Sequence, residues 1–331
     1  MFGQSKYRIS RKQYIELLSS KKNILLIGSY STGKTLLLNE FLEKNKDAVY
    51  IDFSKISINP ENFAAEFVCK VAKKSFESLL KEKNSFIEKI DNELQKIKPD
   101  QKLLIELAFS FANSLGKMEL LLDNFDEFLG LDNYGQIKDI MPLFFSFKLS
   151  NIHFILTSNS DLEKIFSGHN YLIEKIKNFD KKEARELITK ILGKVNDKII
   201  DEIFGLSHGY PRYICAICLK YKEIKEAKKA YSDEIFLEEG LIYNACRFEF
   251  FDSLGKARGK TLSKTILKIL SENDELRLNE ISRKIYRSSP VTQSLLLRLI
   301  SVGLVAKSNG RYNFANPVLK EWAKHYFSEG K

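Results

Sequence analysis

One short segment near the N-terminus constrains the fold of this 331-residue chain more than any other feature. Residues 23–35 read NILLIGSYSTGKT and contain the spacing G-x-x-x-x-G-K-T, the Walker A pattern of a phosphate-binding loop. Such a loop follows a strand and opens a helix. Both are indicated, because Ile24–Ile27 is an apolar run typical of a buried strand and residues 36–42 have a helical pattern. The segment therefore predicts the strand–loop–helix unit of an α/β fold.

The residue types in this loop suit the binding of a polyphosphate. Gly28 and Gly33 allow backbone geometry that a Cβ would block, so that successive N–H groups and the helix N-terminus face an anion. We expect Lys34 to reach the β- and γ-phosphates, where it also serves catalysis, and the Thr35 hydroxyl to ligate Mg²⁺. The expected contacts with ATP or ADP are Gly28, Ser29, Tyr30, Ser31, Thr32, Gly33, Lys34, Thr35 and Leu36.

A second metal ligand is expected from a neighbouring strand. Residues 120–122 are three leucines followed by Asp123, and ligands bind at the carboxyl ends of the strands in open α/β sheets. Asp123 is therefore the predicted Walker B ligand of Mg²⁺, together with Thr35. The next residue is Asn124, which can orient a water molecule but cannot accept its proton.

Two carboxylates and one strand end are candidates for catalysis. Asp126 and Glu127 follow the Walker B position, and either could orient the attacking water; the alternative is a solvated helix start that the helix dipole favours. The predicted strand 152–157 ends in a polar segment, where Asn159 or Thr157 could contact the γ-phosphate or the water. The alternative for this segment is an ordinary helix cap.

Strands and helices alternate up to residue 180, which predicts a parallel sheet covered on both faces. The expected strands are 24–27, 48–53, 120–122, 152–157 and 171–176, and the expected helices are 7–20, 62–80, 85–97, 103–115 and 137–148. Beyond residue 180 the pattern is helical, with helices expected at 181–191, 198–204, 212–220 and around 236–251. Arg212 opens one of these helices and could sense a bound phosphate; the alternative is a surface arginine.

The last 70 residues have a pattern of their own. Helices are expected at 262–270, at 278–285 and from Ser289, as the cap, to Ser301. A hairpin follows around Asn309-Gly310, a favoured two-residue turn. This order predicts a winged helix-turn-helix after a linker at 255–259. The expected domains are an α/β core at 1–180, a helical lid at 181–255 and the winged helix at 256–331.

Positive charge is concentrated in the same terminal part. The whole chain has a net charge of +10, and residues 256–327 hold 14 Lys and Arg against five Asp and Glu, a net charge of +9. This asymmetry predicts an anionic partner, with duplex DNA as the first candidate, because the third helix of a winged helix enters the major groove. The alternative is a lid or a contact with a protein. The expected DNA contacts are Thr292, Gln293, Arg298, Lys307 and Arg311.

A membrane location is not expected. No apolar run approaches the roughly 20 residues that span a bilayer, and residues 1–8 lack the apolar core of a signal peptide. We therefore expect a cytoplasmic protein.

The order of these motifs resembles the archaeal-type P-loop ATPase family, which is related to AAA+ initiator proteins and to the signal-transduction ATPases with numerous domains (STAND). The resemblance covers most of the chain and is carried by the Walker A and Walker B segments, the Thr-Ser-Asn strand end, the Gly-Tyr-Pro-Arg segment at 209–212 and the closing segment GRYNFANPVLKEW at 310–322. It implies a P-loop NTPase core with a helical lid and a C-terminal winged helix, and Mg-ATP hydrolysis.

Two departures from that family's pattern modify the expected activity. Asn124 replaces an acidic residue, and no arginine occurs between Arg11 and Arg185. Ring-forming relatives present an arginine finger between the Thr-Ser-Asn strand end and the last strand, where this chain has only lysines, such as Lys164 and Lys175. We therefore expect a slow, switch-like ATPase that presents a basic winged helix to DNA. The alternative is a nucleotide-gated scaffold or regulator that does not hydrolyse ATP and acts on a protein partner.

Overall fold

The computed structural model describes residues 7, 9–257 and 259–330. Residues 1–6 and Arg258, which carry part of the predictions for the N-terminus and the linker, lie outside the described residues, as does Arg8. The described residues divide into two compact units. The sheet unit contains residues 10–28 and 34–175, and the helical unit contains residues 7, 9 and 29–33 with the described part of 176–331. The three-domain division stays a prediction.

The sheet unit is built on a parallel sheet, for which the described residues supply five strands in the order β2-β3-β4-β1-β5. The strands are β1 (Ile24–Ile27), β2 (Val49–Asp52), β3 (Met118–Asp123), β4 (Ile152–Ser158) and β5 (Leu172–Lys175). All five predicted strands are confirmed. Because the strands are parallel, their carboxyl ends share one edge, where Ile27 pairs with Ser158 and Asp52 pairs with Asp123.

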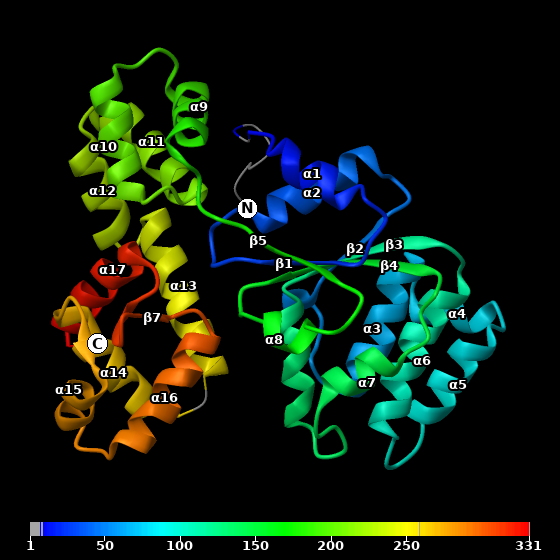
Figure 1. Ribbon diagram of the computed structural model, residues 1–331. Coiled ribbons are helices and arrows are strands. Elements are labelled where there is room, and N and C mark those ends of the chain that lie inside the picture. Colours follow the sequence, from blue (N-terminus) through cyan, green and yellow to red (C-terminus); the bar gives the residue numbers. More distant parts are fainter. Residues whose placement is uncertain (1–6, 8, 258, 331) are drawn as a thin grey trace. The chain divides into compact units, whose positions relative to one another are not determined.

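Helices cover both faces of this sheet (Figure 1). One face carries α1 (Lys12–Leu18) and α2 (Lys34–Lys44), and the other carries α3 (Pro60–Ala72), α4 (Phe76–Lys81), α5 (Ser85–Leu94) and α6 (Gln101–Ser114). The remaining elements are η1 (Phe53–Lys55), η2 (Phe125–Asn133), α7 (Ile140–Ser146) and α8 (Glu163–Phe166). The single helix predicted at 62–80 is wrong, because Lys73 adopts a left-handed conformation and Ser75 caps a new helix.

Phenylalanine rings fill the core between the sheet and α3 and α6. Phe109 of α6 lies 4.7 Å from Phe67 of α3, measured between ring centroids, and also contacts Phe128 and Phe144. These rings are fully or almost fully buried. Edge-on and tilted packing of this kind adds to the free energy gained from burial, so this core holds α6 against the sheet.

The helical unit contains α9 (Lys181–Leu192), α10 (Asp197–Ser207), α11 (Pro211–Ile224), α12 (Ala227–Phe236), α13 (Leu241–Lys256), α14 (Lys260–Glu272), β6 (Leu276–Arg277), α15 (Leu278–Lys284), α16 (Ser289–Ser301), β7 (Val305–Ser308), β8 (Arg311–Phe314) and α17 (Pro317–Ser328). One hydrophobic core runs from Phe179 to Phe327. Trp322 of α17 is fully buried in it and packs on Tyr243 and Phe250 of α13. The helices on either side of residue 255 therefore share their interior.

Three predictions for this unit need correction. The helix expected around 236–251 begins only at Leu241 of α13, after α12 ends at Phe236. Gly240 lies between them, where a Cβ would approach the Glu234 carbonyl oxygen to 2.2 Å, so only glycine fits there. The expected linker is in part helical, since α13 continues to Lys256. The N-cap of α16 is Ser288 rather than Ser289.

The terminal part has the predicted order of three helices and a hairpin. The two central residues of the turn, Asn309 and Gly310, both have positive φ, as the Asn-Gly signal predicts. The short strand β6, which no sequence signal indicated, adds to the hairpin, so that the described residues form an antiparallel sheet in the order β6-β8-β7.

We predict that Phe109→Ala lowers the free energy of unfolding by about 3–5 kcal/mol, because it leaves a cavity among the phenylalanine rings. Denaturant titration followed by circular dichroism measures this loss. The control is Leu103→Ala in the same helix, where the side chain is exposed; an equal effect of both substitutions would contradict the role of the ring cluster.

Candidate functional site

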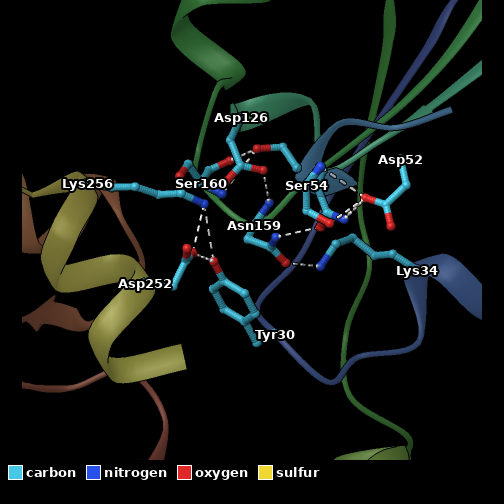
Figure 2. Close-up of polar contacts among 11 residues, drawn as sticks. Tyr30, Lys34, Asp52, Ser54, Asp126, Asn159, Ser160, Asp252 and Lys256 are labelled. Atoms are coloured by element: carbon cyan, nitrogen blue, oxygen red, sulfur yellow. Dashed lines mark hydrogen bonds and ion pairs between the residues drawn. The ribbon is translucent and has the colours of Figure 1, made fainter. Parts of the chain in front are cut away.

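The Walker A lysine is buried at the N-terminus of α2. Its side chain is 5 % exposed, and its Nζ donates hydrogen bonds to the Gly28 carbonyl oxygen at 2.6 Å and to Asn159 Oδ1 at 2.9 Å. Gly33, the residue before it, has a φ of +95°, which explains why glycine is needed at this turn. Lys34 is thus held between the loop backbone and the end of β4 (Figure 2).

The tip of the loop, residues 29–33, belongs to the helical unit. Thr32 donates a hydrogen bond from its hydroxyl to the Ser29 carbonyl oxygen at 2.9 Å. The Tyr30 hydroxyl donates to Asp252 Oδ2 at 2.5 Å, and Lys256 forms an ion pair with the same carboxylate at 2.9 Å (Figure 2). In this conformation the Tyr30 side chain is directed to α13, and nucleotide contacts from the loop tip stay a prediction.

Asp123 and Thr35 meet, as expected for two metal ligands. The Thr35 hydroxyl donates to Asp123 Oδ2 at 2.7 Å, and Asp123 is 1 % exposed. Hydroxyl and carboxylate oxygens are the ligands that Mg²⁺ prefers, so the pair fits a magnesium ion. Among the described residues no group of three or more His, Cys, Asp or Glu could hold a metal; phosphate and water oxygens would therefore have to complete the coordination.

Two further hydroxyl groups hold the Asp123 carboxylate. Tyr50 donates to Oδ2 at 2.9 Å, and Thr157 donates to Oδ1. Burial and the nearby carboxylates raise the pKa of Tyr50 above its usual range, which keeps the phenol a hydrogen-bond donor. Tyr50 was missed from the sequence. The sequence signal that could have found Tyr50 is its position two residues before the end of β2. Residues two apart in a strand lie on the same face, so Tyr50 lies on the same face as Asp52.

Asn124 occupies an unusual backbone conformation after β3. Its φ of 55° lies in the left-handed region, which asparagine tolerates better than most residues. Its backbone N–H donates to the Thr157 hydroxyl at 3.0 Å. Its side-chain amide donates to Asp52 Oδ1 at 2.8 Å and accepts a hydrogen bond from Asn159 Nδ2 at 3.1 Å. The residue that replaces the usual acid thus connects the ends of β2, β3 and β4.

Asp52 is the second residue that sequence reasoning missed. It ends β2 and its side chain is 11 % exposed. Burial by itself raises the pKa of Asp52, but hydrogen bonds from Lys55 and Ser54, with that from Asn124, outweigh burial and hold this pKa below its usual value. The available signal was an aspartate at the end of a predicted strand, the same signal that identified Asp123.

The predicted catalytic carboxylates have different surroundings. Asp126 is buried, and its Oδ1 accepts a hydrogen bond from the Asn159 backbone N–H at 3.0 Å, so it fixes the end of β4. Glu127 is half-buried in the first turn of η2. Arg212 is exposed at the start of α11, in the helical unit. Catalytic roles for these three residues stay predictions.

Four of the predicted DNA contacts have accessible side chains, and one does not. Gln293, Arg298 and Lys307 are exposed, and Arg311 is partly exposed. Thr292 is fully buried, and its hydroxyl donates to the Ser288 carbonyl oxygen at 3.0 Å. In this conformation the Thr292 side chain is therefore not accessible to a partner, and the other four contacts stay predictions.

Comparison with solved structures identifies the fold. The Walker-type ATPase of Pyrococcus abyssi is similar with a TM-score of 0.70 and 18 % sequence identity, over 97 % of both chains. A STAND protein with a tetratricopeptide-repeat sensor from Pyrococcus horikoshii (TM-score 0.47, 16 % identity, 96 % of this chain and 42 % of that one) also matches. So does the Holliday junction branch migration motor of Thermotoga maritima (TM-score 0.44, 14 % identity, 96 % of this chain and 93 % of that one).

The fold is therefore that of a P-loop ATPase, as the Walker A segment predicted. No protein-family model and no curated protein matches the sequence. In the described part of the chain no helix combines the length and apolar character needed to cross a bilayer.

We predict that Lys34→Ala weakens ATP binding by about 2–5 kcal/mol, because it removes the buried cation expected to contact the phosphates. Isothermal titration calorimetry measures the affinity. Lys44→Ala, an exposed position at the other end of the same helix, is the matched control. Equal affinities of Lys34→Ala and the unmodified protein would exclude Lys34 from the phosphate site.

We expect Asp123→Asn to abolish the dependence of ATP binding on Mg²⁺, since a neutral amide is a poorer ligand for a hard cation. Titrations with ATP in Mg²⁺ and in EDTA measure this difference. The exposed Asp47→Asn is the control for the same chemical change. If Mg²⁺ still tightens ATP binding to Asp123→Asn as it does in the unmodified protein, Asp123 is not the metal ligand.

Proposed function

We propose that this protein binds Mg-ATP and hydrolyses it slowly, so that the bound nucleotide acts as a switch. The observation that carries the proposal is the group of Walker residues within the sheet unit. Lys34 lies between the Gly28 carbonyl and Asn159, and Thr35 contacts Asp123. A buried cation beside a pair of oxygen ligands is what a nucleoside triphosphate with its magnesium ion requires.

Slow turnover is supported by two features of the chain. The residue after Asp123 is an amide, and the stretch between Arg11 and Arg185 offers no arginine to a neighbouring subunit. An arginine finger accelerates hydrolysis by about 10³–10⁵-fold in related chemistry. A protein without an arginine finger in this stretch is suited to keep ATP bound long enough for a partner to respond to the ATP-bound conformation.

The rate of phosphate release tests this proposal. We expect Mg²⁺-dependent release at well below about 1 s⁻¹, the low end of common enzyme turnover numbers. The alternative, a scaffold that binds nucleotide without hydrolysing it, predicts tight ATP binding and no release in a single-turnover experiment. Turnover at about 10 s⁻¹ or faster would contradict the switch.

We further propose that residues 256–331 form a winged helix that contacts duplex DNA. Support comes from the helix order α14, α15, α16 followed by the β7–β8 hairpin, from the net charge of +9 in 256–327 and from the exposed Arg298 on α16. Gln293, Lys307 and Arg311 are the other proposed contacts. Basic side chains on a third helix and on its hairpin suit the major groove and the phosphates beside it.

A protein partner is the second candidate for the same surface. Val291 and Leu297 on α16 are exposed, 44 % and 58 % respectively, and Tyr286 before this helix is 87 % exposed. Apolar and aromatic side chains beside basic ones are typical of a protein interface as well as of a DNA-binding helix.

We expect duplex DNA to bind the full-length protein with an affinity that falls as salt rises, with a log–log slope of about −0.9 per phosphate contact. Arg298→Glu and Arg311→Glu should each weaken binding, and Arg298→Glu should change the sequence preference more. Lys164→Glu, which makes the same charge change at an exposed position in the sheet unit, is the control. Absence of DNA binding at low salt would favour the protein partner.

A further inference from the structure

We propose that Asp52 supplies the carboxylate that orients the attacking water, in place of the acid that is absent from position 124. This inference rests on the proposed ATPase function and names a further residue of the same site. In the reaction, the water oxygen forms a bond to the γ-phosphorus while the bond to the oxygen that bridges the β-phosphate breaks. The bridging oxygen keeps the electron pair and leaves with ADP, and the water protons end on phosphate and in solvent.

The position of Asp52 in the sheet is the first support. Asp52 ends β2 and pairs in register with Asp123 at the end of β3. Tyr50, on the same face of β2, reaches the Asp123 carboxylate at 2.9 Å. The end of β2 is therefore directed to the same edge of the sheet as the two predicted metal ligands, where the ligands of such sheets bind.

A chain of hydrogen bonds with one direction connects Asp52 to the Walker A lysine (Figure 2). Lys34 Nζ donates to Asn159 Oδ1 at 2.9 Å, Asn159 Nδ2 donates to Asn124 Oδ1 at 3.1 Å, and Asn124 Nδ2 donates to Asp52 Oδ1 at 2.8 Å. Each amide accepts on the side of the cation and donates on the side of the anion. Such a chain polarises itself and holds every member in one orientation.

This chain explains why position 124 carries an amide. A carboxylate there could accept the hydrogen bond from Asn159 but could not donate to Asp52, and the two negative charges would repel each other. Asn124 and Asp52 are therefore complementary. Many ATPases of this type place a carboxylate directly after the Walker B aspartate; here it lies on the neighbouring strand instead, and Asn124 fixes it.

A purely structural role is the competing explanation. Asp52 is also the N-cap of η1, where it accepts hydrogen bonds from the Ser54 backbone N–H at 3.1 Å and from the Ser54 hydroxyl at 2.7 Å. Its ion pair with Lys55 involves a lysine that is 67 % exposed, and such pairs contribute little. Asparagine and serine cap helices about as well as aspartate. Replacing Asp52 by asparagine or serine therefore removes its negative charge while keeping the helix cap.

We predict that full-length Asp52→Asn binds ATP within about threefold of the unmodified protein but releases phosphate at least roughly tenfold more slowly, since a misplaced reacting group can slow a reaction by about 10²-fold. It should also fail to trap ADP with aluminium fluoride, a mimic of the reacting phosphoryl group with its water. Asp52→Ser should behave alike. Asp47→Asn, before the other end of β2, is the matched control and should leave all three measurements unchanged.

A reciprocal exchange sharpens the test. Asn124→Asp alone places two carboxylates opposite each other and should also slow phosphate release. The double variant Asp52→Asn with Asn124→Asp restores one amide and one carboxylate. It should release phosphate faster than either single variant, whereas independent structural roles predict that the double variant is the slowest.

The outcomes separate the two proposals. If Asp52→Asn turns over and traps ADP as the unmodified protein does, or if it loses ATP binding and thermal stability together with turnover, the role of Asp52 in orienting water is overturned and the ATPase function stands. If the unmodified protein binds ATP but neither releases phosphate nor traps ADP with aluminium fluoride, both proposals are overturned.

Discussion

The burial of one positive charge determines how this site is built. Lys34 is 5 % exposed and is held by the Gly28 carbonyl and Asn159. A buried ammonium group is costly unless oxygen atoms surround it. This cost requires the polar end of β4 at Asn159, and Asn159 in turn is fixed by Asp126 through its backbone and by Asn124 through its amide. The arrangement of three strand ends thus depends on the solvation of one lysine.

The sequence predicted the parts of the fold that have strong local signals. The Walker loop, the five strands and the hairpin turn at Asn309-Gly310 were recognisable because glycine, apolar runs and the Asn-Gly pair each restrict the backbone in a known way. Helix boundaries at Lys73 and Gly240 were missed, since a left-handed lysine has no sequence signature and the close approach of Gly240 to Glu234 depends on tertiary packing.

The candidate site was predictable in its ligands but not in its connections. Thr35 and Asp123 followed from the motif, and their contact is observed. The contacts of Tyr50 and Asp52 with that group depend on the order β2-β3-β4, which places β2 beside the Walker B strand. Strand order is a property of the whole sheet, and the residues of β2 do not encode it locally. The sequence therefore showed that Asn124 is an amide where an acid is usual, but not that it donates a hydrogen bond to Asp52 on the neighbouring strand.

The position of Trp322 has a practical consequence. It is the single tryptophan of the chain, and it is buried where α17 packs on α13 through Tyr243 and Phe250. The indole fluorescence of the whole protein therefore originates at the junction between the predicted lid and the terminal helices. A fragment that begins after α13 would leave this indole without its two aromatic neighbours from α13. The protein thus carries an intrinsic optical reporter of the contact through which α13 and α17 share one hydrophobic core.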